Sequence, residues 1–261
     1  MTQTIEYALF DPTGNTTLLV ETTVPAASQP QVARDLTERE PGTEQVGFVS
    51  PGGSGEIRLR MAGGEFCGNA SMSAAALYLR RAGRREGTVT VRVAGTDEPV
   101  PAVLTALSED AWRGTVTMPQ PLSVGEEDLP GGHRLPMVRF PGIAHVIAET
   151  AMSRAEAETL ARRWCRRLGA EALGLMLLDR KAKTLAPLVF VPAAGTLCWE
   201  SSCASGTTAV GAWLAASSGR PVGLSLTQPG GTLEIAADAD GRLLLSGTVR
   251  LLHCASAGIA L

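Results

Sequence analysis

Two cysteines stand in nearly the same sequence context in the two halves of the chain, and this repetition is the strongest constraint on the fold. Cys67 is followed by a polar turn and a run of small, helix-forming residues, and Cys203 is followed by the same arrangement. Residues 68–79 and 204–215 both have the composition of a capped helix that packs closely through small side chains. The repeated unit predicts a duplicated architecture.

The segments around the two cysteines repeat in the same order. A β-rich run begins at Val89, 22 residues after Cys67 (89 − 67), and another begins at Leu224, 21 residues after Cys203 (224 − 203). Asn15 precedes the first cysteine by 52 residues (67 − 15), and His145 precedes the second by 58 (203 − 145). Gly-Thr-Val segments also follow both cysteines, at residues 114–116 and 247–249.

The local patterns predict the same series of elements in each half. An opening strand pair is followed by a helix, a hairpin, the cysteine turn with its helix, and several strands. The expected helices cover residues 28–40 and 153–169, and the hairpin turns fall at 51–55 and 179–181. We therefore expect an α+β fold of two pseudo-symmetric domains. Residues 1–125 would carry Cys67 and residues 126–261 would carry Cys203, with the active site between them.

Composition narrows the possible functions. The chain has 261 residues, 44% of them hydrophobic and 19% charged, with a formal net charge of −3. These values indicate a globular protein without the basic surface needed for nucleic acid or an anionic membrane. Two arginine-rich segments, 80–85 and 162–167, read as a helix C-terminus and the solvated face of a helix. No apolar run is long enough to span a membrane.

Cysteine usage predicts a cytoplasmic protein with reduced thiols. There are five cysteines, and the first seven residues lack the features of a signal peptide. A free cysteine is most often a small buried residue. We apply that interpretation to Cys165, Cys198 and Cys254, and we set Cys67 and Cys203 apart because of their shared context.

No metal or cofactor is expected. The cysteine spacing lacks the paired ligands of a zinc site, and the three histidines are scattered. A pyridoxal-phosphate enzyme needs a Schiff-base lysine, but Lys181 and Lys183, the two lysines of the chain, both fall in a polar hairpin turn. The sequence also lacks a Gly-x-Gly-x-x-Gly fingerprint and a Walker loop.

Two cysteines at helix N-termini suit one particular chemistry. Racemisation removes a proton from a tetrahedral carbon and returns one to the opposite face, so it needs two acid–base groups across the substrate. A helix N-terminus stabilises a thiolate, and its N–H groups can also bind a carboxylate. Pseudo-symmetric domains would bring two such groups together. The sequence therefore predicts that Cys67 and Cys203 are the paired acid and base of a cofactor-independent amino-acid racemase or epimerase.

Several motifs resemble the diaminopimelate epimerase superfamily. Cys-Gly-Asn at residues 67–69 and Cys-Ala-Ser-Gly-Thr at 203–207 are similar to its two cysteine motifs, with Ala204 where glycine is usual. Pro-Thr-Gly-Asn at 12–15 and Glu-Gln-Val at 44–46 are similar to further motifs. The resemblance implies two mirrored domains, each with strands around a central helix, and a substrate between them.

Two departures argue against diaminopimelate as the substrate. The segment before the second cysteine is contracted to Glu-Ser-Ser at residues 200–202 and lacks the arginine that would bind a distal carboxylate. The segment before the first cysteine, residues 61–66, is also shortened. A bidentate arginine contact is not easily replaced.

The sequence resembles more closely the histidine racemases that supply D-histidine for staphylopine-type, nicotianamine-like metallophores. The similarity extends along nearly the whole chain. It includes Glu-Gln-Val-Gly-Phe at 44–48, Glu-Phe-Cys-Gly-Asn-Ala-Ser-Met-Ser at 65–73, Met-Pro-Gln at 118–120, Trp-Glu-Ser-Ser-Cys at 199–203 and Gln-Pro-Gly-Gly at 228–231. The resemblance implies that both cysteines are bases and that Glu44 is important for activity.

The remaining candidate site residues are polar groups near the same motifs. We expect Asn15 and Asn69 to bind the amino-acid head group, although local turn and cap bonding is an alternative. Glu44 could accept a hydrogen bond from an imidazole or ammonium group, and His145 is the counterpart of Asn15 in the repeat. The full substrate-binding set is Asn15, Glu44, Gln45, Gly68, Asn69, His145, Glu200, Ala204 and Ser205.

Three functions fit the sequence. The first is interconversion of L- and D-histidine, the second is racemisation or epimerisation of another amino acid, including diaminopimelate, and the third is binding without catalysis. Two retained thiols speak against the third, because binding alone does not need them. The expected partner is a small amino-acid substrate, and a homodimer is the default for a soluble enzyme.

Overall fold

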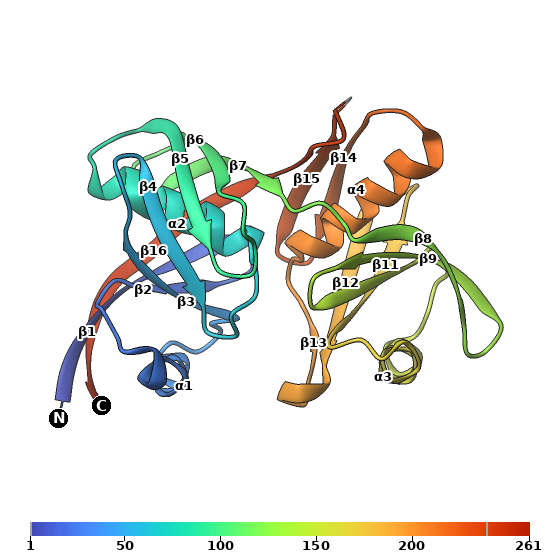
Figure 1. Ribbon diagram of the computed structural model, residues 1–261, viewed down its shortest axis with the longest axis horizontal. Helices are drawn as coiled ribbons and strands as arrows, with labels where there is room; N and C mark the ends of the chain where they lie inside the picture. The colour runs from blue at the N-terminus through green and yellow to red at the C-terminus, as the bar shows by residue number, and fades with distance from the viewer. Residues whose placement is uncertain (1, 239) are drawn as a thin grey trace. The chain divides into compact units, whose positions relative to one another are not determined.

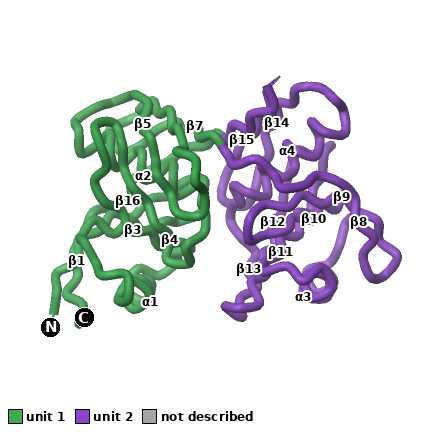
Figure 2. The backbone as a smooth tube through the Cα atoms, in the orientation of Figure 1, with its two compact units in different colours: residues 1–117, 246–261 green, residues 118–245 purple. Residues whose placement is uncertain are grey.

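The computed structural model describes residues 2–238 and 240–261. Its internal contacts divide the chain into two compact units (Figure 2). Unit 1 contains Met1–Thr117 and Ser246–Leu261, and unit 2 contains Met118–Leu245. The chain therefore leaves unit 1 once and returns to it at its C-terminal end.

Unit 1 is a ring of strands around a helix (Figure 1). Seven strands are neighbours in chain order, and β16 pairs with both β7 and β1, which closes the ring. The strands are β1 (Thr2–Pro12), β2 (Thr17–Val20), β3 (Gln45–Pro51), β4 (Glu56–Met61), β5 (Glu86–Val93), β6 (Val100–Ala106), β7 (Ala111–Met118) and β16 (Leu243–Ala260).

Helix α2 (Gly68–Arg81) fills the ring of unit 1 and packs against strands β1 to β6. Its residues 68–77 are all buried, so the helix has no solvent face over that length. Small side chains suit this position, because they let strands approach the helix from several directions. Outside the ring, α1 (Gln29–Arg39) packs against β3 after a short 3-10 turn at Ala26–Ser28.

Unit 2 also packs its own strands against a central helix. Helix α4 (Ala204–Ser218) is the central helix, and α3 (Arg154–Leu168) packs against β11 and β12. The strand order is β15, β14, β12, β11, β10, β9, β8, and β13 pairs with β12. Their bounds are β8 (Ser123–Leu129), β9 (His133–Phe140), β10 (Ile143–Ala148), β11 (Leu173–Asp179), β12 (Thr184–Val191), β13 (Thr196–Trp199), β14 (Val222–Gln228) and β15 (Gly231–Ala237), with a 3-10 turn at Pro192–Ala194.

The two units confirm the α+β fold and the repeated order of elements. The expected helices at 28–40 and 153–169 are α1 and α3, and the two hairpin turns lie between β3 and β4 and between β11 and β12. The arginines at residues 80 and 81 occupy the last turn of α2. Those of 162–167 are exposed on α3.

The boundary between the units differs from the division at residues 125 and 126. Residues 118–125 belong to unit 2, and residues 246–261 belong to unit 1. The reason is strand pairing: β16 runs antiparallel to β1 from the pair Thr2 and Ala260 to the pair Pro12 and Val249. The Gly-Thr-Val segment at 247–249, expected in the second domain, therefore lies in unit 1.

Two of the cysteines expected to be buried are exposed. Cys165 is buried in the core of unit 2, but Cys198 and Cys254 are exposed. Cys198 lies on the short strand β13, where exposed and partly buried residues alternate, and Cys254 lies on the exposed stretch of β16. On β13 the one-residue alternation of a strand exposes Cys198, whereas on β16 Cys254 lies in a run of three exposed residues, 252–254.

Candidate active site

Cys67 occupies the N-cap of helix α2. Its backbone is extended, with φ −134° and ψ 113°, and its Sγ accepts a hydrogen bond from the N–H of Ala70 at 3.4 Å. Its carbonyl oxygen accepts two more, from the N–H of Ser71 at 2.9 Å and the hydroxyl of Ser71 at 2.8 Å. The thiol thus takes the place of the Ser, Thr or Asp side chain that usually caps a helix.

Cys203 repeats this geometry at the start of α4. Its φ and ψ are −124° and 107°, and its Sγ accepts a hydrogen bond from the N–H of Gly206 at 3.4 Å. Its carbonyl accepts bonds from the N–H of Thr207 at 3.0 Å and the hydroxyl of Thr207 at 2.7 Å. The two cysteines therefore have equivalent backbones, and each sulfur accepts the same capping hydrogen bond from the third residue of its turn.

The surroundings of the second sulfur favour the protonated thiol. Cys203 is 5% exposed, and burial raises the pKa of its thiol well above the usual range. The carboxylate of Glu200 raises this pKa further, through its charge and through a hydrogen bond with the thiol. The Ser205 hydroxyl and the N–H of Gly206 act in the opposite direction and do not outweigh burial.

His145 is connected to the same sulfur through a serine. Its Nε2 lies 3.0 Å from the Oγ of Ser205, which in turn lies 3.6 Å from the Sγ of Cys203. The ring is completely buried, and this burial lowers the pKa of His145 to about 3, so the imidazole is neutral. Gly174 makes room for it, because a Cβ there would lie 2.2 Å from Nδ1. Neutral imidazole can both donate and accept a proton.

Unit 1 has a polar group of its own around the loops that precede β2 and β3. Asn15 donates from Nδ2 to a carboxylate oxygen of Glu44 at 2.8 Å, which fixes the orientation of the amide. The backbone N–H groups of Glu44 and Gln45 both donate to the carbonyl of Thr16. The predicted residues Asn15, Glu44 and Gln45 thus belong to one cluster.

Four buried polar atoms near these motifs lack a hydrogen-bond partner within residues 2–238 and 240–261. They are Asn15 Oδ1, Asn69 Oδ1, His145 Nδ1 and Ser202 Oγ. A buried polar group without a partner is costly, and such groups are often satisfied by a ligand or a bound water. These atoms are therefore candidate contacts for a polar substrate.

Within each unit, the sequence-predicted residues come together as follows. In unit 2, Cys203, Ala204 and Ser205 begin α4, with Glu200 and His145 directly or indirectly in contact with the sulfur. In unit 1, Cys67, Gly68 and Asn69 begin α2. Sequence reasoning gave no role to Ser202 or Gln228. The Gln-Pro-Gly-Gly segment at 228–231 can be recognised as a motif in the sequence. The sequence does not show that this segment contacts the cysteine turn.

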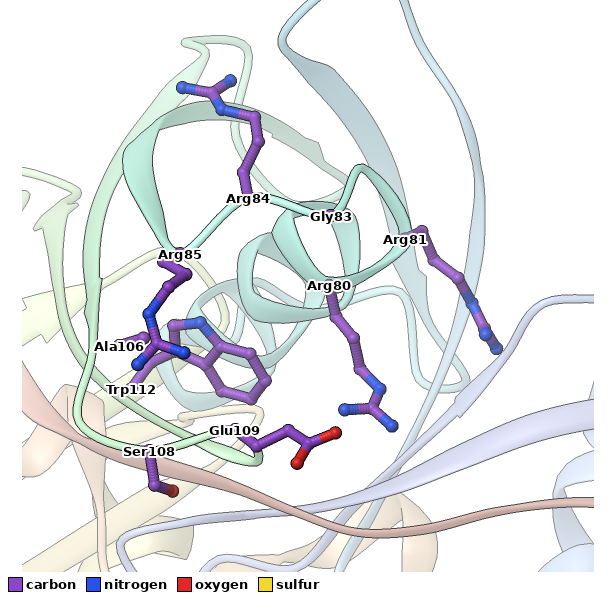
Figure 3. A pocket seen from close by; sticks show the side chains of 9 residues that line it. All are labelled: Arg80, Arg81, Gly83, Arg84, Arg85, Ala106, Ser108, Glu109 and Trp112. Carbon is purple, nitrogen blue, oxygen red and sulfur yellow. The ribbon is translucent and has the colours of Figure 1, made fainter.

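A pocket of about 430 Å³ in unit 1 lies at the other end of α2 from Cys67 (Figure 3). Figure 3 shows Arg80, Arg85 and Glu109 around the indole of Trp112, whereas Arg81 and Arg84 point away. The 14-residue helix separates this pocket from the cysteine by about 20 Å. Charges of both signs line it and it holds no acid–base pair of thiols, so it is not the candidate site.

Two further features concern the described parts of the chain, metal binding and membrane-spanning helices. No group of three or more His, Cys, Asp or Glu side chains there could hold a metal ion. Among the same residues, no helix is both long and apolar enough to cross a membrane.

Comparison with known proteins places the chain in a family. The family model described as the histidine racemase CntK N-terminal domain matches residues 4–252. The chain belongs to this family. The histidine racemase of Fusobacterium nucleatum subsp. nucleatum is 28% identical over 259 residues, which cover 96% of this chain and 95% of that protein. The histidine racemase of Staphylococcus aureus is also 28% identical, over 80% of this chain and 79% of that protein.

Solved structures agree with this family at the level of the fold. A predicted epimerase from Pseudomonas aeruginosa has a TM-score of 0.74 at 18% identity, covering 98% of this chain and 99% of that one. A hydroxyproline epimerase from Agrobacterium vitis has a TM-score of 0.67 at 12% identity, covering 98% and 93%. The chain has an epimerase-like fold, and as a member of the family it is an isomerase of the amino-acid racemase class.

Proposed function

We propose that this racemase interconverts L- and D-histidine without a cofactor, with one of Cys67 and Cys203 removing the α-proton and the other donating a proton to the opposite face. The observation that carries the proposal is the matched pair of N-cap thiols, each accepting a hydrogen bond from the third residue of its turn at 3.4 Å. The choice of histidine is supported by the two relatives, which are both named histidine racemase.

The proposed step leaves atoms and charges balanced. One sulfur begins as a thiolate and takes the proton from Cα, and the other begins as a thiol and gives its proton to the opposite face. The electron pair left by the C–H bond is held on the substrate and its carboxylate until the second proton arrives. No oxidant or reductant is needed. The two sulfurs finish with their protonation states exchanged.

The differences between the sulfur environments support an assignment of the resting state. Burial and Glu200 raise the pKa of Cys203, which favours a thiol there. Cys67 is only partly buried. We therefore assign Cys67 as the resting thiolate and Cys203 as the resting acid. Because the two groups would titrate together across a bound substrate, the assignment describes the free enzyme.

Both helix starts offer groups for the amino-acid head. A helix leaves its first N–H groups without an internal partner, and here those of residues 68, 69, 204 and 205 are available to a carboxylate. The same groups would stabilise negative charge that develops on the carboxylate in the transition state. The unpartnered Oδ1 of Asn15 suits the substrate ammonium, because an amide oxygen accepts but does not donate.

The side chain of the substrate would contact the remaining polar groups. Glu44 is exposed beyond its bond with Asn15 and is placed to accept from an imidazole N–H. Neither lysine is available for a Schiff base near the cysteines, since Lys181 and Lys183 are both exposed in the turn between β11 and β12. The resemblance to metallophore-associated racemases supports the proposal that the product, D-histidine, is used in metallophore synthesis.

A hydrogen-exchange assay tests the proposal. The protein is incubated in D2O with single enantiomers of histidine, diaminopimelate and a panel of other amino acids, and deuterium at Cα is measured together with the enantiomeric ratio. We expect exchange and racemisation with histidine in both directions. Exchange with diaminopimelate and none with histidine would refute the substrate, and no exchange with any amino acid would refute the two-thiol reaction.

A further inference from the structure

A buried glutamine from a distant strand holds the backbone of the second cysteine. The Oε1 of Gln228, at the end of β14, accepts a hydrogen bond from the N–H of Cys203 at 2.9 Å. Its Nε2 donates to the Oγ1 of Thr207, also at 2.9 Å. The hydroxyl of Thr207 donates to the carbonyl of Cys203 at 2.7 Å, which closes a ring of three hydrogen bonds around that residue.

The donors and acceptors of this ring allow one arrangement. A backbone N–H must donate, so the atom facing it is the amide oxygen of Gln228, and the amide nitrogen must face Thr207. The Thr207 hydroxyl then accepts from Gln228 and donates to the carbonyl of Cys203. Gln228 is 4% exposed and Thr207 is completely buried, so water does not compete for these bonds.

A second contact holds the same loop. The N–H of Gly230, two residues after Gln228, donates to the carbonyl of Ser201 at 2.7 Å. Residues 228–230 therefore contact the chain on both sides of the buried Ser202. This double attachment fixes the entry into α4, from which the N–H of Gly206 points at the Cys203 sulfur.

Unit 1 repeats the local half of this ring. Ser71 occupies the place of Thr207, four residues after its cysteine, and its hydroxyl donates to the carbonyl of Cys67 at 2.8 Å. Residue 92, which follows Cys67 by the same 25 residues as Gln228 follows Cys203, is an exposed arginine paired with Glu56. Position 92 supplies no counterpart of the buried amide.

We infer that Gln228 is a positioning residue for Cys203 in the racemase reaction. It acts through the backbone of Cys203 and the first turn of α4, and it does not touch the substrate. The inference rests on the proposed role of Cys203. Reaction rates depend on the placement of a catalytic group to within about 1 Å, a shift that can cost about 100-fold.

Four variants distinguish the effect of losing the hydrogen-bond ring from the effect of a substitution elsewhere in unit 2. Gln228→Leu removes both amide contacts, Thr207→Val removes the hydroxyl at nearly constant shape, and Thr207→Ser retains it. Gln120→Leu is the matched control, because Gln120 is exposed and its amide donates to the carbonyl of Gly241. Circular dichroism and thermal melting establish that each variant is folded.

Two readouts are used, of which one does not depend on turnover. The first is kcat and KM for histidine across pH. The second is the pH midpoint for alkylation of Cys203 by iodoacetamide, followed by mass spectrometry with Cys67 as the internal reference. Loss of the ring would loosen the turn and weaken the bond from Gly206 to the sulfur, so the Cys203 midpoint should move to higher pH.

We expect Gln228→Leu to lower kcat by about 10- to 100-fold with KM changed less than about threefold. Thr207→Val should also lower kcat. The double variant should lower kcat by less than the product of the two single fold-decreases, because both changes break one ring. Thr207→Ser and Gln120→Leu should be close to the parent protein. The Cys67 midpoint should stay unchanged throughout.

A folded Gln228→Leu variant with unchanged kcat and an unchanged Cys203 midpoint would overturn the inference. If that variant does not fold, Thr207→Val decides by the same criteria. Failure of the proposed function is a separate outcome. It would be seen as full turnover in Cys203→Ser, while the alkylation midpoint would still report whether Gln228 positions the thiol.

Discussion

The turns at Cys67 and Cys203 share a backbone but differ in what surrounds the sulfur. Both sulfurs accept a hydrogen bond from the third residue of the turn at 3.4 Å. Around Cys203 the residue at this place is Gly206, the sulfur is buried, and Glu200 and Gln228 are in contact with the cysteine. Around Cys67 the corresponding residue is Ala70 and the cysteine is partly exposed. A duplicated backbone gives two equivalent N-cap thiols, and the surrounding side chains make them chemically unequal.

The largest expected effect comes from removing either sulfur. Cys67→Ser and Cys203→Ser should each lower kcat/KM for histidine by about 1000-fold or more, because a hydroxyl is too weak an acid for rapid proton exchange near neutral pH. Chiral chromatography of the product measures this loss. If one variant retained a tenth of the activity, the two sulfurs would not be partners in one reaction.

The second comparison concerns the residue three places after each cysteine. A Cβ at Gly206 would lie 2.1 Å from Met176 Sδ and 3.2 Å from Cys203 Sγ, whereas Ala70 already carries one. Gly206→Ala should therefore displace the Cys203 turn and lower kcat by about 10- to 100-fold. Ala70→Gly should cost about 1 kcal/mol of stability and change kcat less than threefold. Equal effects at the two positions would remove the asymmetry that we describe.

The third comparison concerns pH. His145 in unit 2 has a pKa lowered to about 3 by burial, below its ordinary value of 6.5. The unfolded chain takes up a proton as the pH falls through 6.5 and the folded protein does not. The neutral state of His145 therefore costs the folded protein no stability above pH 6.5. As the pH falls from 6.5 to 3, the free energy of unfolding decreases, because the unfolded state binds a proton that the folded state does not. Between pH 6.5 and 5, the parent protein should lose about 2 kcal/mol of unfolding free energy that His145→Gln retains.

Urea denaturation of both proteins at several pH values measures this difference. Parallel curves of stability against pH for the parent and His145→Gln would contradict a neutral, buried imidazole. The Asp and Glu residues are the same in both proteins, so their contributions to the pH dependence of stability cancel in the comparison.

The smallest effect is expected at the two exposed cysteines. Cys198→Ser and Cys254→Ser should change kcat for histidine less than about twofold, because surface substitutions away from a site usually have small effects. The same kinetic assay measures them. A large loss of kcat in either variant would mean that a thiol other than Cys67 and Cys203 contributes to the reaction.

Local signals were sufficient to predict most of the elements. The capping turns before α2 and α4, and the hairpins after Pro51 and Asp179, are encoded by adjacent residues, and both pairs occur where expected. The pairing of β16 with β1 could not be predicted in this way. It joins residues that are between 237 (249 − 12) and 258 (260 − 2) positions apart, and nothing in either strand alone specifies the other.

The same limit applies to the candidate site. The roles of Cys67 and Cys203 as helix caps follow from the motif that contains each of them. The contact of Gln228 with Cys203 spans 25 residues and depends on where β14 ends relative to α4. The exposure of Cys198 and Cys254 depends on strand register, which a hydrophobic scale does not give.

The return of β16 to unit 1 has a consequence for the timing of biosynthesis. The strand that closes the ring around α2 is made only after all 128 residues of unit 2, from residue 118 to residue 245, have been translated. At about 5–20 residues per second, the ribosome needs roughly 6 to 26 seconds for that stretch. During this interval the nascent N-terminal portion has an open strand edge at β1, and a chaperone has the opportunity to shield it.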